Sequence, residues 1–148
     1  MTRDTPAEAV AYALVLIRRR QSRRALAKAA GSSKAATATG MLLDVIDAEA
    51  GPCSVSTIAE RLAVDQPRAS RLVAGAVADG LVRRESDQRD GRRSLLALTT
   101  EGTAAVEAMH AFRVAMSDRA MAGWTDRERT EFARLLSDFV ARMEELSP

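Results

Sequence analysis

Cysteine and histidine are almost absent from this chain, with one of each among 148 residues. The lone cysteine, Cys53, can form no internal disulfide, and one cysteine with one histidine supplies too few ligands for a zinc cluster. We therefore expect neither a metal nor a cofactor. A chain without disulfides fits the reducing cytoplasm, and the cytoplasm is the location we predict.

Long apolar runs and aromatic residues are also scarce. No apolar stretch approaches the ~20 residues of a membrane span, so we expect no membrane partner. The first residues, MTRDTPAEAV, lack the apolar core of a signal peptide. Aromatics make up 3% of the chain, whereas hydrophobic residues rich in Ala, Leu and Val make up 47%. This composition favours a globular, mainly α fold. Because no repeat or linker is visible, we expect one domain over residues 1–148.

Helix-start signals mark the N-terminal third. A capping box at Thr5 and Glu8, with Pro6 at the first helical position, opens a first helix. The small polar residues 34–39 predict either a loop or a weak helical turn. A second helix should follow and stop at Gly51-Pro52.

Residues 55–78 predict two short helices joined by a tight turn. Ser56 or Thr57 should cap the first of them, and Thr57 with Glu60 matches a capping box. Asp65 or Gln66 should cap the second helix. Apolar residues in this second helix recur at the spacing of a buried stripe: Ala69, Leu72, Val73, Ala76 and Val77.

Two strands should follow, at 81–85 and 94–99, joined by the turn signal Asp90-Gly91. A long helix is expected from Thr99 or Thr100. A further capping box at Thr125 and Glu128 should open the last helix. The predicted fold class is therefore mainly α with a small β-hairpin wing: a winged helix-turn-helix with six helices.

Apolar stripes on the first and last helices exceed what a small winged core needs. Such stripes are typical of helix pairing, so we expect these two regions to form a homodimer interface. The predicted dimerisation residues are Val10, Leu14, Ile17, Phe132, Leu135, Leu136, Phe139, Val140 and Met143.

The outer face of the second short helix is polar and basic at its N-terminal end. A recognition helix presents such residues to double-stranded DNA. Arg68 and Arg71 can each fork to guanine or bind phosphate, and Gln66 can contact adenine. Ser70 can reach a phosphate or a base. The alternative is an ordinary solvated helix face.

The hairpin tip carries a second basic cluster. Arg89, Arg92 and Arg93 lie on a loop with few apolar residues, and such a loop suits the negative potential of a narrow minor groove. Asp90 among these arginines can hold Arg92 in one pose through a bidentate ion pair. The alternative is a charged hairpin that only solubilises.

Three short motifs stand out within residues 54–102: the Gly-Leu-Val-x-Arg entry at residues 80–84, the Asp-x-Arg tip at residues 90–92, and the Leu-Thr-x-x-Gly exit at residues 98–102. Through these motifs, this part of the chain resembles the MarR family of bacterial transcriptional regulators. The resemblance implies a winged helix-turn-helix over about 35–100. It also implies dimerisation helices over about 5–30 and 100–146.

The resemblance further implies repression that a small phenolic ligand or thiol oxidation relieves. The thiol-sensing branch carries its cysteine early in the first helix, where this chain has Ala11, Tyr12 and Ala13. Cys53 lies elsewhere, so we expect it to be a small packing residue. His110 is expected at the surface or an interface. The run 18–24 either touches DNA or the partner subunit, or forms a solvated face.

These observations predict a sequence-specific DNA-binding regulator and no enzyme. We expect a ligand-responsive repressor that binds a pseudo-palindromic operator as a homodimer, with a small-molecule effector as a possible further partner. One alternative is a chromosome-architectural or protein-interaction module without an inducer. Another is a DNA alkyltransferase, suggested by Pro52-Cys53. Ser54 and Val55 replace the His and Arg of that motif, so nothing activates the thiol.

Overall fold

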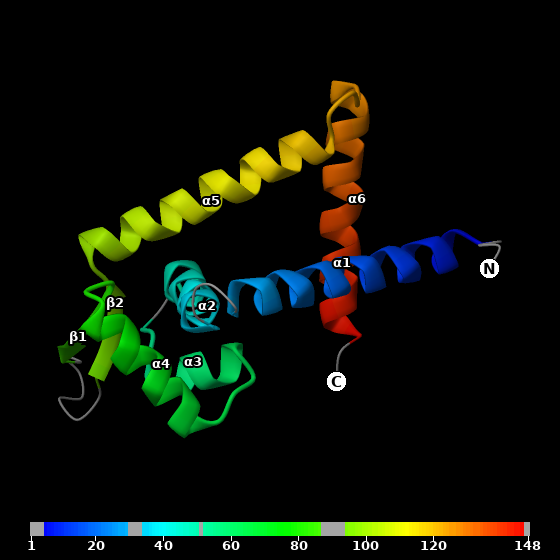
Figure 1. The fold of residues 1–148 in the computed structure, drawn as a ribbon. Coiled ribbons are helices and arrows are strands. Elements are labelled where there is room, and N and C mark those ends of the chain that lie inside the picture. The colour runs from blue at the N-terminus through cyan, green and yellow to red at the C-terminus, as the bar shows by residue number, and fades with distance from the viewer. Residues whose placement is uncertain (1–4, 30–33, 51, 87–93, 147–148) are drawn as a thin grey trace. The chain divides into compact units, whose positions relative to one another are not determined.

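The computed structural model describes residues 5–29, 34–50, 52–86 and 94–146, without the side chains of residues 20–37. Within this part of the chain it has six helices and one two-stranded antiparallel hairpin, which confirms the predicted fold class (Figure 1). The elements are α1 (Pro6–Ala29), α2 (Lys34–Ala48), α3 (Val55–Arg61), α4 (Gln66–Ala78), β1 (Val82–Ser86), β2 (Ser94–Leu98), α5 (Thr100–Ala120) and α6 (Asp126–Glu145).

The contacts divide the chain into two units, Met1–Glu107 and Ala108–Pro148. The prediction of a single domain stays a prediction. In the first unit α2 begins at Lys34, so residues 34–39 belong to a full helix rather than a loop. Three of these six residues are Ala, the strongest helix former, which favours continuation into the apolar part of α2.

Every element from α2 to α5 contributes at least one residue to the core of the first unit. Its buried apolar residues are Leu42, Leu43, Ile46, Cys53, Ile58, Ala69, Val73, Ala76, Val82, Leu96 and Val106. The predicted stripe of α4 is confirmed, with Ala69, Val73 and Ala76 fully buried. The core therefore fixes which face of α4 remains outside.

The hairpin pairs Val82 with Leu98 and Ser86 with Ser94. Cys53 adds an isolated antiparallel bridge, and its carbonyl oxygen accepts the Leu96 N–H at 2.8 Å. This bridge attaches the segment before α3 to the wing. Helices α3 and α4 lie against each other, with the hairpin beside α4 (Figure 1).

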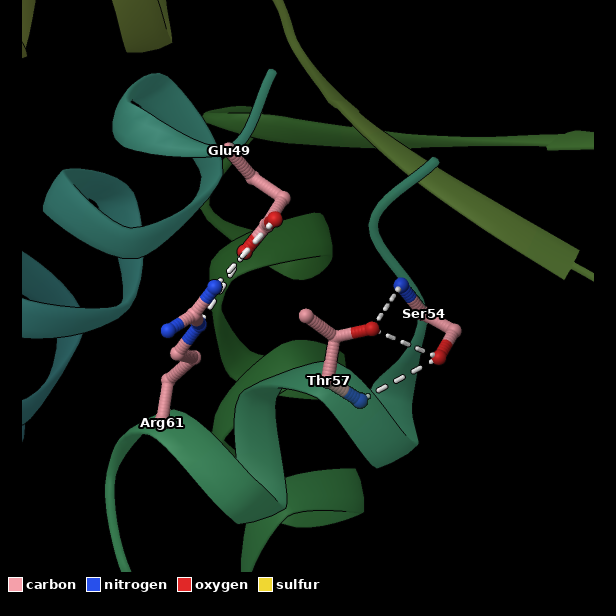
Figure 2. Close-up of polar contacts among 4 residues, drawn as sticks. All are labelled: Glu49, Ser54, Thr57 and Arg61. Carbon is pink, nitrogen blue, oxygen red and sulfur yellow. Dashed lines mark hydrogen bonds and ion pairs between the residues drawn. The ribbon is translucent and has the colours of Figure 1, made fainter. Parts of the chain in front are cut away.

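Helix α3 begins earlier than the sequence analysis expected. Ser54 is its N-cap, with an extended backbone, so the prediction of Ser56 or Thr57 as the cap was wrong. The Thr57 N–H donates to Ser54 Oγ at 3.2 Å, and the Ser54 N–H donates to Thr57 Oγ1 at 3.2 Å (Figure 2). Thr57 is therefore the third helical residue of the capping box, the position that the sequence analysis assigned to Glu60.

The turn between α3 and α4 closes as a Schellman motif. Ala63 adopts a φ of 50°, its N–H donates to the Glu60 carbonyl at 3.1 Å, and the Val64 N–H donates to the Ala59 carbonyl at 3.0 Å. Asp65 then caps α4, because its Oδ1 accepts the Arg68 N–H at 2.7 Å. This confirms the first of the two predicted caps.

A close approach joins the end of α4 to the start of α5. The Thr99 hydroxyl donates to the Gly80 carbonyl at 2.6 Å, and the Thr99 N–H donates to the Leu81 carbonyl at 3.0 Å. The Gly102 N–H in turn donates to Thr99 Oγ1 at 3.0 Å. Gly102 lies so close that a Cβ there would overlap the Leu81 carbonyl oxygen. The Leu-Thr-x-x-Gly exit therefore fastens α5 to the α4–β1 corner.

The second unit contains the corner between α5 and α6. The predicted capping box of α6 is confirmed: the Glu128 N–H donates to Thr125 Oγ1 at 3.3 Å, and the Thr125 N–H donates to Glu128 Oε2 at 2.8 Å. Arg129 also bonds the Met121 carbonyl at 3.1 Å and Asp118 at 3.4 Å. These contacts set the direction in which α6 leaves α5.

Candidate nucleic-acid interface

The exposed face of α4 carries the four DNA-binding residues predicted for this helix. Gln66, Arg68, Ser70 and Arg71 are all exposed, whereas Ala69 between them is fully buried. Because Asp65 caps the helix immediately before Gln66, the first turn is held in place. The structure therefore brings these four side chains together on the N-terminal half of one helix.

The two arginines of this face keep their charge available. In the part of the chain that the structure describes, neither Arg68 nor Arg71 pairs with a carboxylate. The Arg71 Nε–H donates to the Pro67 carbonyl oxygen at 3.3 Å, which orients the guanidinium along the helix. Its two terminal nitrogens remain for a forked contact to guanine or to a phosphate.

Gln66 makes a contact that the sequence analysis did not anticipate. Its Nε2 donates to the hydroxyl of Ser56, across the α3–α4 turn, at 3.3 Å. Ser56 was considered only as a helix cap, and the actual cap, Ser54, leaves it on the first turn of α3. In the sequence, only the tight turn predicted at 63–65 indicated that Ser56 and Gln66 could come into contact.

The wing is described only along its strands. Arg83 and Glu85 lie on β1 and form an ion pair at 2.7 Å, so the charge of Arg83 is partly compensated. Arg84 is exposed on the same strand. The predicted tip residues Arg89, Asp90, Arg92 and Arg93 lie outside the described residues.

An ion pair joins the residue that follows α2 to the end of α3. Arg61 Nε lies 3.2 Å from Glu49 Oε2, and the two side chains point toward each other in Figure 2. The hydrogen bond to Glu49 and the charge of that carboxylate raise the pKa of Arg61. Because Arg61 is 61% exposed, water screens this pair, and its contribution to stability is small.

Cys53 belongs to the core rather than to a reactive site. It is 3% exposed, and burial together with the nearby charge of Glu49 raises the pKa of its thiol. A reactive cysteine needs the opposite shift. Among the described residues no group of three or more His, Cys, Asp or Glu side chains could hold a metal ion.

The predicted dimerisation residues lie at the surface of the single chain. Val10, Leu14 and Ile17 of α1 are 43%, 39% and 53% exposed. On α6, Phe139 is half-buried, and the exposed residues are Phe132, Leu135, Leu136, Val140 and Met143. Trp124 adds an edge-on ring contact to Phe132, with centroids 5.2 Å apart. Within the described residues no helix is long and apolar enough to cross a membrane.

Two further expectations concern polar residues of the long helices. His110 on α5 is exposed, as expected for a surface or interface residue. Arg18 and Arg19 of α1 are exposed, and the side chains of the rest of the 18–24 run lie outside the described residues.

Comparison with known proteins supports the same fold. A model of the MarR family matches residues 37–93, from α2 to the wing. The chain is 33% identical over 96 residues to the HTH-type transcriptional regulator YxaD of Bacillus subtilis (strain 168). That match covers 65% of this chain and 66% of YxaD, so it spans just under two thirds of the relative.

Solved structures extend the similarity to nearly the whole chain. A MarR family protein from Bacillus stearothermophilus has a TM-score of 0.77 and 18% identity, covering 97% of this chain and 99% of that one. Streptococcus pneumoniae FabT, solved in complex with DNA, has a TM-score of 0.70 and 17% identity, covering 97% and 100%. These likenesses show the winged helix-turn-helix fold. By the family model over residues 37–93, its relative and its fold, this chain is similar to regulators of the MarR family.

Proposed function

We propose that this protein regulates transcription by binding a specific double-stranded DNA operator through α4. The observation that carries the proposal is the exposed N-terminal half of α4, where Arg68 and Arg71 are free of carboxylate partners among the described residues. A recognition helix enters the major groove with its N-terminal residues against the base edges. The buried stripe of α4 keeps this face turned outward.

The proposed contacts are of three kinds: base readout, backbone contacts and minor-groove contacts. Gln66 and Arg71 carry groups that can form paired hydrogen bonds with adenine and guanine, so they are assigned to base readout. Arg68 and Ser70 are assigned to phosphates or to neighbouring bases, and the wing residues Arg89, Arg92 and Arg93 to the minor groove. Asp90 is assigned the role of holding Arg92.

The DNA-binding form is proposed to be a homodimer. The apolar stripe of α6 and the apolar residues of α1 are exposed on the single chain, and exposed apolar surface of this extent marks an interaction site. A two-fold dimer presents two copies of α4 to DNA, so the operator should be a pseudo-palindrome. Ligand-relieved repression, in the cytoplasm, is the proposed mode of regulation, as the family resemblance implies.

Selection from random-sequence duplexes with the purified protein tests the proposal. We expect enrichment of two inverted half-sites centred ~10 bp apart, one helical turn. Raising the salt concentration from 50 to 200 mM should weaken binding on the order of 10³-fold, because each phosphate contact releases counterions. Equal affinity for selected and scrambled duplexes would favour the architectural alternative. Absence of DNA binding would favour the protein-interaction module.

A further inference from the structure

We infer that Ser56 is a specificity-determining residue: its hydroxyl orients the amide of Gln66 so that the amide selects adenine. The inference rests on the proposed function and adds a residue of α3 to the base-reading machinery. Its geometric basis is the 3.3 Å hydrogen bond from Gln66 Nε2 to Ser56 Oγ. The two residues are ten positions apart and meet only because α3 and α4 pack against each other.

The local capping arrangement leaves Ser56 available for this contact. Three hydroxyl residues surround the start of α3, and two of them, Ser54 and Thr57, are bonded to each other in the capping box (Figure 2). Ser56 takes no part in that box and is exposed. Gln66 is the first residue of α4 and is also exposed, directly after the Asp65 cap. Both side chains therefore meet at the end of α4 that a major groove would receive.

The Ser56 hydroxyl has only one hydrogen, and this sets the direction of its hydrogen bond with Gln66 when the protein is bound to DNA. A phosphate oxygen only accepts hydrogen bonds, so a Ser56 hydroxyl that contacts the DNA backbone must donate its one hydrogen there. It can then only accept from Gln66, which fixes Nε2 toward Ser56. The second N–H and Oε1 of Gln66 remain together as a donor and an acceptor. Adenine N7 and N6–H₂ present the complementary pair in the major groove.

Without the hydroxyl, the Gln66 amide can rotate and exchange its oxygen with its nitrogen. The side chain must then be ordered when DNA binds, which reduces its preference for adenine. We expect Ser56→Ala to lower discrimination at the position read by Gln66 by about three- to tenfold per half-site. The remaining positions of the operator should keep their preferences.

The test measures relative affinity for all four base pairs at each operator position. The proteins are the wild type, Ser56→Ala, Ser56→Thr, Gln66→Ala and the double variant Ser56→Ala/Gln66→Ala. We expect Ser56→Ala to lose preference at the same position as Gln66→Ala, and Ser56→Thr to retain it because threonine keeps the hydroxyl. In base preference at every operator position, the double variant should match Gln66→Ala, because the serine selects bases only through the glutamine.

A different pattern overturns the inference while leaving the proposed function intact. If Ser56→Ala weakens binding evenly at all sequences, Ser56 is only a phosphate contact. If the double variant loses more specificity than Gln66→Ala, the two residues act independently. Failure of the wild type to select any sequence refutes the proposed function itself. Equal thermal unfolding midpoints for all five proteins show that their differences in base preference arise from DNA binding and not from partial unfolding.

Discussion

The Gly102→Ala substitution should destabilise the first unit severely, although alanine is normally the better helix residue. Gly102 lies in the first turn of α5, and a Cβ there would overlap the Leu81 carbonyl oxygen and lie 3.0 Å from the Leu81 carbonyl carbon. These are backbone atoms, so rotation of a side chain cannot relieve the overlap. The start of α5 must move away from the α4–β1 corner.

That movement breaks the two hydrogen bonds from Thr99 to the Gly80 and Leu81 carbonyls. At about 1 kcal/mol each they contribute about 2 kcal/mol, and strain from overpacking adds about 2 kcal/mol. The helix propensity gained by alanine offsets about 1 kcal/mol. We therefore expect a loss of about 3 kcal/mol in the free energy of unfolding and a Tm lower by roughly 10 °C.

Urea and thermal unfolding, at one protein concentration because a dimer is expected, measure this loss. Gly75→Ala is the matched control: Gly75 lies inside α4, is exposed, and a Cβ there meets nothing within 4 Å. It should stabilise the protein by about 0.5–1 kcal/mol. If Gly102→Ala is as stable as Gly75→Ala, the close approach of the Leu81 carbonyl does not require glycine at position 102.

Three further predictions address the dimer, the thiol and the wing. Leu136→Asp places a charge on the apolar stripe of α6 and should shift the protein to monomers in sedimentation, whereas Thr130→Asp, on the opposite face by helical spacing, should not. Because Cys53 is 3% exposed and burial raises the pKa of its thiol, the folded thiol should react with a disulfide reagent at pH 8 more slowly than the unfolded thiol. The raised pKa of Cys53 also contributes to the stability of the folded state; this contribution is complete below pH 9.0 and is lost as the pH rises through the higher pKa of the folded thiol. Equal reaction rates of the folded and unfolded thiol would contradict both predictions. Arg92→Ala should lower operator affinity and weaken any preference for A·T-rich flanks, and Asp90→Ala should show part of the same loss. If Arg92→Ala binds the operator as tightly as the wild type does, the wing is only a charged hairpin.

Local signals in the sequence predicted most of the fold. The periodic stripe of α4 and the capping boxes at Thr5 and Thr125 depend on residues three or four positions apart, and the structure confirms each of them. The prediction of the α3 cap was wrong because three hydroxyl residues within four positions could each serve as the N-cap. The extended backbone of Ser54 decides among them. Residues 34–39 were ambiguous because small residues carry no periodic pattern.

Contacts between elements were not predictable from the sequence. The motif that contains Gly102 was recognised, but the reason for glycine is the Leu81 carbonyl, 21 positions earlier in the chain. The hydrogen bond between Ser56 and Gln66 likewise depends on how α3 crosses α4. The four candidate residues of α4 needed only helical spacing, which explains why the sequence placed them together on the exposed face.

The most direct test of DNA recognition through α4 is the affinity of Arg71→Ala for the selected operator and for a scrambled duplex at equal salt. Arg71 is exposed and has two terminal nitrogens available for DNA. Loss of a paired base contact at ~1–3 kcal/mol should lower operator affinity about 5- to 150-fold per half-site and narrow the ratio between the two duplexes. Arg127→Ala, an exposed α6 arginine with the same charge change, should bind as the wild type does. An unchanged operator affinity for Arg71→Ala, or an equal loss in both variants, would contradict recognition by this face of α4.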